Sequence, residues 1–400
     1  MIAAPDPTIT PATLVQRAQG MVDVLRARQA ECESLGRLPE ATNDAFLEAG
    51  FYRILQPRRF GGYEFDMGTF ARVMIEIARG CPSSGWVLAL TGGHAIMLSA
   101  FFSEAAQRDV YGATGDFRGP SRTAPVAAER VDGGYRLTGG WDYVSGCDIA
   151  THFVCGLRVD NELLMGVLDR ADCRIVDNWN PIGMRGTGSR RVEVDAVFVP
   201  GHRVIPPPRD AFNSRNAPGR HVHANPMYVA GRLTSVLFEE MAAVAVGVAR
   251  GALDVYAHEL CSSRLSMPPY QLRSESAEYQ RHFGDAWALI EVAEATVLKV
   301  ADSYMEYARQ DAEAGIPFSD ERDLQLQLLE QYATRLAGDA VDLMFRTCGT
   351  HVAQGQSLLQ RYFRDMAVIK THIAAQTDRG AESFGRAHFT GSGLPQPGAL

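Results

Sequence analysis

The sequence predicts a mainly α-helical protein with a β domain in the middle of the chain. The prediction rests on the period at which apolar residues recur. They recur at helical spacing up to about residue 115 and again from about residue 229, and they alternate with a period of two between about residues 120 and 208. The 400 residues exceed the roughly 250 to 300 at which a single core stops growing. We therefore expect an N-terminal helical domain over 1–118, an antiparallel β domain over 119–226 and a C-terminal four-helix bundle over 227–400.

In the first domain, the pattern predicts four helices. Thr13 is the expected N-cap of a long helix over 14–36, and a short amphipathic helix follows over 41–50. A third helix covers 70–79 and ends before a glycine. The fourth, over 85–101, is nearly all small and apolar, which predicts a helix that is buried on most sides.

In the middle domain, β structure is expected over 130–138, with a turn at Gly133-Gly134, and over 151–159, 162–168 and 191–199. The segment 206–226 that follows has no periodicity and is rich in Pro, Asn and Arg. Structureless loops of this length inside compact domains are uncommon unless they are lids or disordered. We interpret this segment as a lid.

The last domain is expected to contain four long helices, over 229–260, 276–314, 320–347 and 357–384. Helices of such length can pack side by side along their whole extent. They are therefore interpreted as a four-helix bundle.

The composition is that of an ordinary globular protein, with 46% apolar and 22% charged residues. Lys and Arg number 39 against 47 Asp and Glu, so the formal charge of −8 argues against a nucleic-acid-binding protein. No apolar run is expected to approach the roughly 18 uncharged residues of a membrane span. The first ten residues, MIAAPDPTIT, lack the features of a signal peptide. We expect no nucleic-acid or membrane partner and a location in the cytoplasm.

Motifs for the common metals and nucleotides are absent from the sequence. The seven cysteines are an odd number without a Cys-x-x-Cys or a Cys/His cluster at zinc spacing, which is typical of buried thiols in a reducing compartment. There is no Gly-x-Gly-x-x-Gly after a strand, no P-loop, no His-Glu-x-x-His and no Gly-x-Ser-x-Gly. We expect no metal site and no site for a nicotinamide or ATP.

Two glycine-rich turns in the middle domain are candidates for a binding site. They are TGGWDYVSG over 138–146 and GMRGTGSRR over 183–191. On spacing alone, the favoured interpretation is a pair of hairpin turns whose glycines supply positive φ, with Trp141 in the core. The alternative is that their backbone and hydroxyl groups line a flat heteroaromatic ligand, with Trp141 as a wall. Spacing does not decide between the two.

The same turns, together with the order of the domains, resemble the acyl-CoA dehydrogenase fold. That fold carries a Trp-containing segment that ends in a small polar residue and Gly, here 141–146, and an Arg-Gly-small turn before a strand that ends in Val-Pro, here 184–200. The segment QRYFRD over 360–365 is similar to the Gln-Arg segment near the end of such chains. The resemblance covers roughly residues 41–389.

Many dehydrogenases of this fold carry their catalytic base about seven residues before that late arginine, and this position is Gln354 here. The stretch 348–360 contains no Asp or Glu, and an amide has no basic lone pair with which to abstract an α-proton. Some dehydrogenases place the base on a helix after the β domain, where this chain has Glu239 and Glu240. An FAD-dependent acyl-CoA dehydrogenase is therefore the second choice.

The sequence is identified as a member of another branch of this fold, the oxygenase components of two-component flavin-dependent monooxygenases. This branch includes para-hydroxyphenylacetate hydroxylase and dibenzothiophene monooxygenase. The similar residues are Trp86 and His94 in GWVLALTGGH, Ser145 in WDYVSG, the segment MRGTGSRRVEVDAVFVPGHRV, and His388 in RAHFTG. The resemblance implies that reduced FMN or FAD and O2 form a C4a-hydroperoxide, which hydroxylates a phenolic or polycyclic aromatic substrate. It also implies a homotetramer and a separate NAD(P)H-dependent flavin reductase.

By the same resemblance, Ser145 holds the flavin near N5, and His94 and His388 are catalytic residues that donate to the peroxide or take the proton of a phenol. His388 is expected to face the substrate and His94 to lie closer to the oxygen. The cofactor-binding residues implied by the resemblance are Trp141, Ser145, Gly146, Thr187, Ser189, Arg264 (at the flavin phosphate) and Thr350 (where a neighbouring subunit would approach).

Two further alternatives stay open. An N- or S-oxygenase of the same fold would share every flavin residue and would differ only in acting on an amine or a sulfide. A non-enzymatic flavin-binding protein would use the same glycine-rich turns without turnover.

Overall fold

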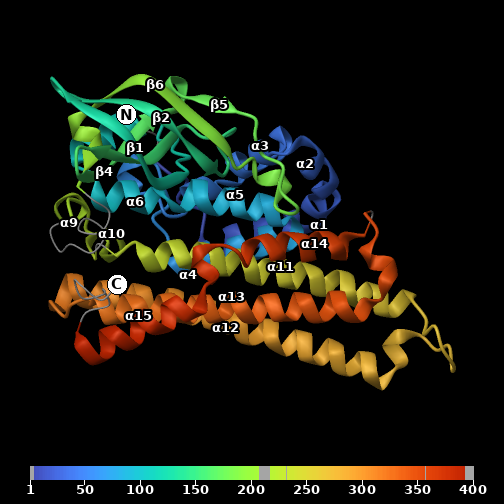
Figure 1. Ribbon diagram of the computed structural model, residues 1–400. Coiled ribbons are helices and arrows are strands. Elements are labelled where there is room, and N and C mark those ends of the chain that lie inside the picture. The colour runs from blue at the N-terminus through green and yellow to red at the C-terminus, as the bar shows by residue number, and fades with distance from the viewer. Residues whose placement is uncertain (1–3, 207–216, 231, 356, 392–400) are drawn as a thin grey trace.

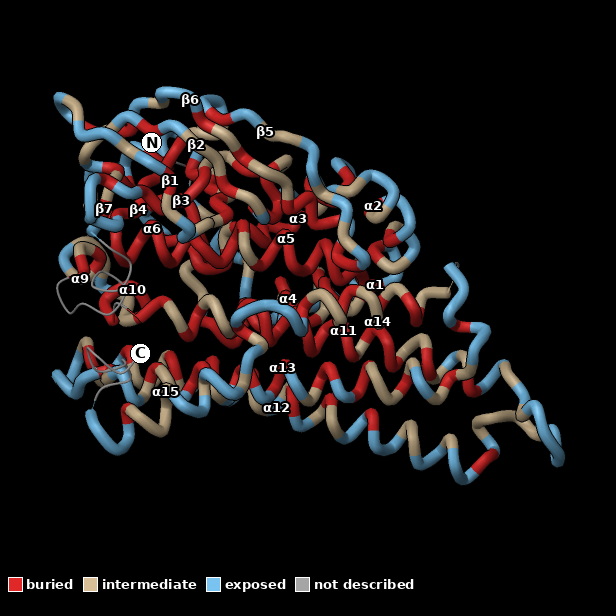
Figure 2. Tube along the Cα trace, viewed as in Figure 1, coloured by how far each residue is buried: buried red, intermediate tan, exposed pale blue. Residues whose placement is uncertain are grey.

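The computed structural model describes residues 4–206, 217–230, 232–355 and 357–391. A β sheet forms one side of the molecule, the N-terminal helices lie beneath it, and the long C-terminal helices run side by side on the opposite side (Figure 1). Buried residues concentrate where the N-terminal and C-terminal helices meet (Figure 2). The fold is therefore mainly helical with a sheet from the middle of the chain.

The helices of the N-terminal zone are α1 (Pro11–Ala27), α2 (Gln29–Leu35), α3 (Glu40–Ala49), α4 (Met67–Gly80), α5 (Pro82–Gly93), α6 (Ala95–Phe101) and α7 (Glu104–Tyr111). The N-cap of α1 is Thr10, so the prediction of Thr13 is wrong by three residues. Both threonines take part in the cap, because the Thr10 side chain accepts from the Thr13 amide in a capping box. The predicted helix over 14–36 is divided at Arg28, which separates α1 from α2.

The apolar stretch predicted as one buried helix is two helices, α5 and α6, which meet at His94. Pro82–Phe101 is long and apolar enough to cross a membrane, so the expectation that no run approaches that length is wrong. Its placement is that of a core helix, because 89% of the apolar window is buried inside the fold. The interruption turns His94 into a junction between two buried helices.

The seven-stranded sheet contains β1 (Ser121–Val131), β2 (Gly134–Val144), β3 (His152–Val159), β4 (Glu162–Asp169), β5 (Arg174–Val176), β6 (Arg190–Pro200) and β7 (Val204–Ile205), in the order β5-β6-β2-β1-β3-β4-β7. Most neighbouring strands are antiparallel, but β1 and β3 are parallel, so the sheet is mixed and the prediction of an antiparallel domain is wrong at this pair. The reason is the connection 145–151, which leaves the end of β2 and passes to the far side of β1. Since β2 ends where β1 began, β3 starts at the same end as β1.

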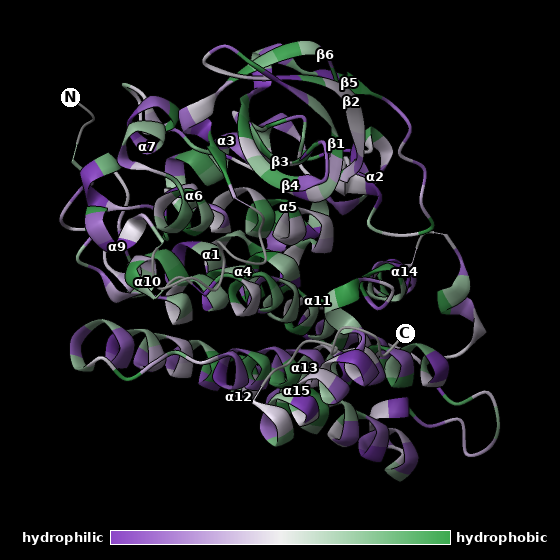
Figure 3. Cartoon of the chain, turned by 60° about the vertical axis from the view of Figure 1, so that its left-hand side comes forward, coloured by the Kyte–Doolittle hydropathy of each residue, from purple (hydrophilic) through white to green (hydrophobic). Residues whose placement is uncertain are grey.

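The C-terminal zone contains the short helices α9 (Gly219–Val222) and α10 (Pro226–Val229) and the longer α11 (Thr234–Ser262), α12 (Ala277–Ala314), α13 (Asp320–Cys348), α14 (Leu358–Ile369) and α15 (Thr377–Thr390). The predicted helix over 357–384 is divided into α14 and α15, which together take the fourth position beside α11, α12 and α13. Figure 3 shows that α4 and α11, in the middle layer, are mainly apolar, whereas α12 and α15 present more polar residues at the edge. The four-helix bundle is confirmed.

Most of the predicted lid, 207–216, lies outside the described residues. Of the remainder, Ala217 and Gly219 are buried. Arg220 forms an ion pair with Asp311 of α12, with 2.5 Å between Nη2 and Oδ1. This part of the segment is packed against the bundle.

Candidate active site

A cavity of about 610 Å³ lies between the β domain and the helices. Its volume is in the range of small-molecule binding sites. The residues that line it come from α5, β1, the two glycine-rich turns, α11 and the segment around the end of α14: Trp86, Leu90, His94, Ser121, Arg122, Thr123, Tyr143, Ser145, Trp179, Met184, Thr187, Ser189, Leu237, Phe238, Glu240, Met241, Val368, Thr371, His372, Ile373 and Ala374. About half of these residues are apolar or aromatic, and the others are polar or charged.

Three hydroxyl groups on the cavity wall form a chain of hydrogen bonds. Ser145 Oγ lies 2.7 Å from Ser189 Oγ, which lies 2.6 Å from Thr187 Oγ1. Thr187 donates to the Met184 carbonyl oxygen at 2.9 Å, so Thr187 accepts from Ser189 and Ser189 accepts from Ser145. At the other end, Trp86 Nε1 donates to Ser145 Oγ at 3.1 Å. The chain therefore has one direction, from the indole N–H to a backbone carbonyl.

Among the described residues, this direction leaves the Ser145 hydroxyl oxygen with one unused acceptor lone pair. Its only hydrogen is given to Ser189, one lone pair accepts from Trp86, and a hydroxyl oxygen has a second lone pair. That lone pair belongs to a group that lines the cavity. Ser145 can thus accept an N–H from a ligand and cannot donate to it without breaking the chain.

The two glycine-rich turns are joined through Gly146. Its amide donates to the Thr187 carbonyl oxygen at 2.8 Å. Gly146 has φ of +73°, and a Cβ there would lie 2.9 Å from Thr91 Cγ2, so both the conformation and the space favour glycine. The sequence-predicted residues Ser145, Gly146, Thr187 and Ser189 are brought together.

Trp141 is not a wall of this cavity. It is 2% exposed in the core of the β domain, and its Nε1 donates to the Gly156 carbonyl oxygen at 3.2 Å. Its side chain is directed into the sheet core, so the interpretation favoured by spacing holds for this residue. The tryptophans at the cavity are Trp86 and Trp179.

His94 lies where it was expected, in the wall of the cavity. Its Nδ1 lies 2.9 Å from the Gly119 carbonyl oxygen, and its Nε2 lies 3.4 Å from Oε2 of Glu240. Of the two glutamates weighed as a dehydrogenase base, Glu240 lines the cavity, whereas Glu239 is buried in the bundle beside Glu330. Burial raises the pKa of Glu240, and His94 opposes this rise.

The structure does not bring His388 to His94, which corrects the prediction that the two share one site. His388 is exposed on α15, with Nδ1 2.8 Å from Oε1 of Glu321. The division of the predicted helix over 357–384 is the cause, because α15 restarts on the far side of the bundle along α13. The second histidine of the cavity is His372, which the sequence analysis missed.

His372 sits between α14 and α15, and its ring lies edge-on to Trp86 with 5.6 Å between centroids. The Ala374 amide donates to its Nδ1 at 3.2 Å. His372 is exposed at the surface of the chain, and partial desolvation by its neighbours together with the charge of Arg122 lowers its pKa. A neutral ring whose Nδ1 accepts must carry its hydrogen on Nε2, so His372 offers an N–H donor. Its position seven residues after Asp365, close behind the Gln-Arg segment, was an available signal.

Arg264 and Thr350 do not line the cavity of their own chain. Arg264 is exposed beyond the end of α11, and its Nη1 donates to the Tyr270 carbonyl oxygen at 3.1 Å. Thr350 is exposed at the end of α13, and both residues lie at the end of the bundle. The roles implied for them would need a second subunit.

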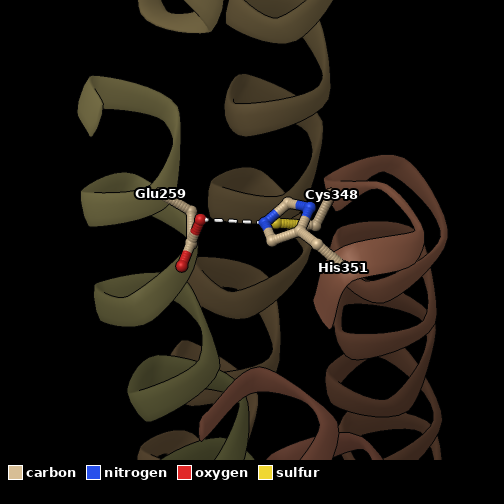
Figure 4. Close-up of side chains that lie close together, drawn as sticks. All are labelled: Glu259, Cys348 and His351. Carbon is tan, nitrogen blue, oxygen red and sulfur yellow. Dashed lines mark hydrogen bonds and ion pairs between the residues drawn. The ribbon is translucent and has the colours of Figure 1, made fainter. Parts of the chain in front are cut away.

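Near Thr350, the side chains of Glu259, Cys348 and His351 lie together (Figure 4), with ligand atoms within 4.8 Å of one another. His351 Nε2 already pairs with Glu259 Oε2 at 3.1 Å. The Arg273 guanidinium donates to the Cys348 carbonyl oxygen, so a cation stands beside the group. The pKa of the Cys348 thiol is raised to about 11 by burial and by Glu259. These contacts describe a hydrogen-bonded cluster and do not favour a metal ion.

The cavity fits a flavin on two observations. The free lone pair of Ser145 is what the N5–H of a reduced flavin requires, and the apolar and aromatic walls suit a flat ring system. The glycine at 146 lets the backbone of one turn approach the other closely. Ser145, Ser189 and Thr187 are the residues that would hold the ring.

Comparison with known proteins shows what the chain is similar to. Residues 15–113 match the family described as acyl-CoA dehydrogenase, N-terminal domain, and residues 240–377 match acyl-CoA dehydrogenase, C-terminal domain. The chain is 34% identical over 394 residues to the flavin-dependent monooxygenase, oxygenase subunit HsaA, of Rhodococcus jostii (strain RHA1). The aligned region covers 95% of this chain and 98% of that one.

Two other relatives are similar over nearly their whole length. The FADH(2)-dependent resorcinol hydroxylase, oxygenase component, of Rhizobium sp. (strain MTP-10005) is 29% identical, covering 96% of this chain and 97% of that one. The solved structure of XiaF from Streptomyces sp. in complex with FADH2 and glycerol matches with a TM-score of 0.87 at 26% identity, covering 96% of each chain.

Proposed function

The chain belongs to the acyl-CoA dehydrogenase superfamily, in the branch of flavin-dependent monooxygenase oxygenase subunits, and we propose that it is the oxygenase component of a two-component aromatic hydroxylase. Reduced FMN or FAD and O2 would supply the oxygen atom that is transferred. The substrate is a phenolic or polycyclic aromatic compound. The names of the relatives, a resorcinol hydroxylase among them, support this substrate class.

The observation that carries the proposal is the one-way hydroxyl chain that ends at Ser145. A ligand N–H is the partner that Ser145 can still take, and reduced flavin has such an N–H at N5 where oxidised flavin has none. The chain is fixed at both ends, by an indole and by a backbone carbonyl, so the acceptor is oriented before the ligand arrives. The site is therefore selective for the reduced form of the cofactor.

His372 binds the substrate oxygen in this proposal. Its Nε2–H donates to a hydroxyl or phenolate oxygen, and Arg122 on the same cavity wall favours the anionic form. The apolar side chains of Leu237, Phe238 and Ile373 would then lie against the aromatic rings.

The remaining parts of the system are also proposals. A separate NAD(P)H-dependent reductase would deliver the flavin, since relatives are named as subunits or components of larger systems. A homotetramer would place Arg264 and Thr350 of one subunit near a neighbour. The cytoplasm is the proposed compartment, because it keeps thiols reduced and the seven cysteines are unpaired.

The test is single-turnover oxygenation. The purified protein is mixed anaerobically with reduced FMN or FAD and then with ¹⁸O2 and a panel of a phenol, a polycyclic phenol, an amine and a sulfide. One labelled oxygen in an aromatic hydroxyl group supports the proposal, and label only on nitrogen or sulfur refutes the aromatic substrate class. No labelled product from any member, with all O2 recovered as hydrogen peroxide, refutes hydroxylation of these classes.

An acyl-CoA dehydrogenase remains the second candidate because Glu240 lies buried in the cavity, as a base on the first helix after the β domain would. Oxidised FAD on the protein should then be bleached by an acyl-CoA in the absence of O2. We expect no bleaching.

A further inference from the structure

The ring of His94 has one nitrogen whose hydrogen the fold determines. Nδ1 lies 2.9 Å from the Gly119 carbonyl oxygen. Because a carbonyl oxygen only accepts hydrogen bonds, Nδ1 carries a hydrogen. In a neutral ring, Nε2 is then a lone pair, and it faces Oε2 of Glu240 at 3.4 Å.

The Glu240 carboxyl is fully buried against the end of α5. A Cβ at Gly93 would lie 2.0 Å from its Oε1, so the glycine at this position makes room for the carboxyl. Within the described part of the chain, neither Glu240 oxygen nor His94 Nε2 has a hydrogen-bond partner. The carboxyl is thus held by packing and is directed at the histidine.

Two hydrogen-bond acceptors that face each other are stable only with a proton between them. An ionised Glu240 beside a lone pair on Nε2 would be a buried charge with no partner, which is costly. With one more proton, either the carboxyl donates to Nε2 or an imidazolium donates to the carboxylate. In both cases the pair is satisfied and holds one proton.

Among the residues that the structure describes, the groups around the pair do not offer Glu240 another partner. From α4, the Phe70 ring lies against Gly93. Arg122 on β1 and His372 after α14 line the same cavity, but His94 is the charge that acts on Glu240. Glu239, the next residue on α11, lies instead with Glu330 of α13 and with Asp302 of α12.

We propose that Glu240 is a positioning residue that keeps one proton on the His94–Glu240 pair, so that the pair can supply a proton at the wall of the cavity. The proposal rests on the proposed function. In that reaction an aromatic C–H, O2 and the two electrons and two hydrogens of reduced flavin give C–OH, water and oxidised flavin. The pair gives its proton to the oxygen that leaves as water, and the proton released from the hydroxylated ring carbon returns to the pair.

The first experiment uses the ligand-free protein and therefore does not depend on turnover. The ¹⁵N signals of labelled histidine side chains are followed over pH, with His94 assigned by comparison with His94→Asn. At neutral pH, Nε2 of His94 should be protonated or accepting from the carboxyl, and the signals should report the loss of the single proton of the His94–Glu240 pair as the pH rises. A free lone pair on Nε2 at neutral pH overturns the proposal.

Glu240→Gln is the matched change, because the amide keeps the volume of the carboxyl and donates an N–H to Nε2 without titrating. The deprotonation step of the pair should be absent from the signals of this variant and present in those of Glu239→Gln, the control one residue away. An unchanged step in Glu240→Gln overturns the proposal. If the glutamine variant does not fold, the wild-type titration decides the outcome alone.

In turnover, Glu240→Gln should lower the hydroxylated product per flavin oxidised on the order of 10²-fold, the usual contribution of a positioned acid, with hydrogen peroxide in its place. Glu239→Gln should leave this ratio unchanged. If the wild type hydroxylates nothing but its His94–Glu240 pair holds and loses one proton as described, the proposed function fails while the proton-holding pair stands. If the wild type hydroxylates and Glu240→Gln keeps its full yield, the inference fails alone.

Discussion

Replacing Ser145 by alanine should both destabilise the protein and uncouple its reaction, by amounts that the hydrogen-bond chain sets. The change removes the acceptor of the Trp86 indole N–H and the donor to Ser189, both of which are buried. A buried donor left without a partner costs about 1 to 3 kcal/mol. Ser189 keeps its bond to Thr187, so we expect a loss of about 2 kcal/mol in the free energy of unfolding, measured by urea denaturation.

The same change removes the acceptor proposed for the flavin N–H. A bond of about 1 to 3 kcal/mol corresponds to a roughly 5- to 150-fold change in a rate or partition ratio. The assay is the ratio of hydrogen peroxide to hydroxylated product per reduced flavin oxidised, at a temperature where the variant is folded. We expect this ratio to rise within that range.

Ser99→Ala is the matched control for Ser145→Ala. Ser99 is equally buried and also makes two side-chain hydrogen bonds, to the Ala95 carbonyl oxygen at 2.8 Å and to the Tyr111 hydroxyl at 2.9 Å, but it does not line the cavity. It should lose similar stability and keep the wild-type peroxide ratio. A wild-type ratio in Ser145→Ala, or an equal rise in Ser99→Ala, would refute the role assigned to the hydroxyl chain.

Three further predictions follow from the contacts described. His372→Ala should weaken binding of a phenolic substrate about tenfold, because one hydrogen bond of about 1.4 kcal/mol is lost. His388→Ala should leave the affinity unchanged. Equal losses of affinity in a binding titration of the two variants would contradict the role assigned to His372. Burial raises the pKa of Glu239 beside Glu330 to about 8, so the folded state holds a proton that the unfolded state loses near 4.5. The free energy of unfolding should therefore fall as the pH rises from about 5 to 8, and it should fall less in Glu239→Gln. Identical urea midpoints across this pH range would count against the raised pKa. Gly146→Ala should cost about 1 to 3 kcal/mol in stability through its positive φ, whereas an unchanged midpoint would show that the turn relaxes freely.

The sequence predicted the fold well because periodicity reports how each element is buried. It failed where a helix was interrupted without a strong breaker, as at Arg28, at His94 and between α14 and α15. The parallel pairing of β1 with β3 was missed for another reason, because strand direction depends on where a connection crosses and not on the alternation within a strand.

The site was predicted in part. Ser145, Gly146, Thr187 and Ser189 lie in local turns whose residues stay together in any arrangement of the domains. To choose His372 over His388, one must know where the chain runs after α14. The spacing of apolar residues does not give that direction. Spacing favoured Trp141 in the core, and the resemblance misplaced it at the flavin, because its position in β2 directs the side chain to the sheet core.

The crossover 145–151 has a consequence for how such an enzyme acquires new substrates. This one segment turns β3 parallel to β1 and also carries Ser145 to the cavity, so an insertion or deletion there would shift the register of the sheet together with the flavin contact proposed for Ser145. Leu237 and Phe238 on α11, and Ile373 after α14, are instead single side chains on helices and turns whose backbone does not depend on them. Directed evolution toward larger or smaller aromatic compounds should therefore succeed by point changes on the helical side of the cavity, while libraries that vary the length of the crossover should yield mostly inactive protein.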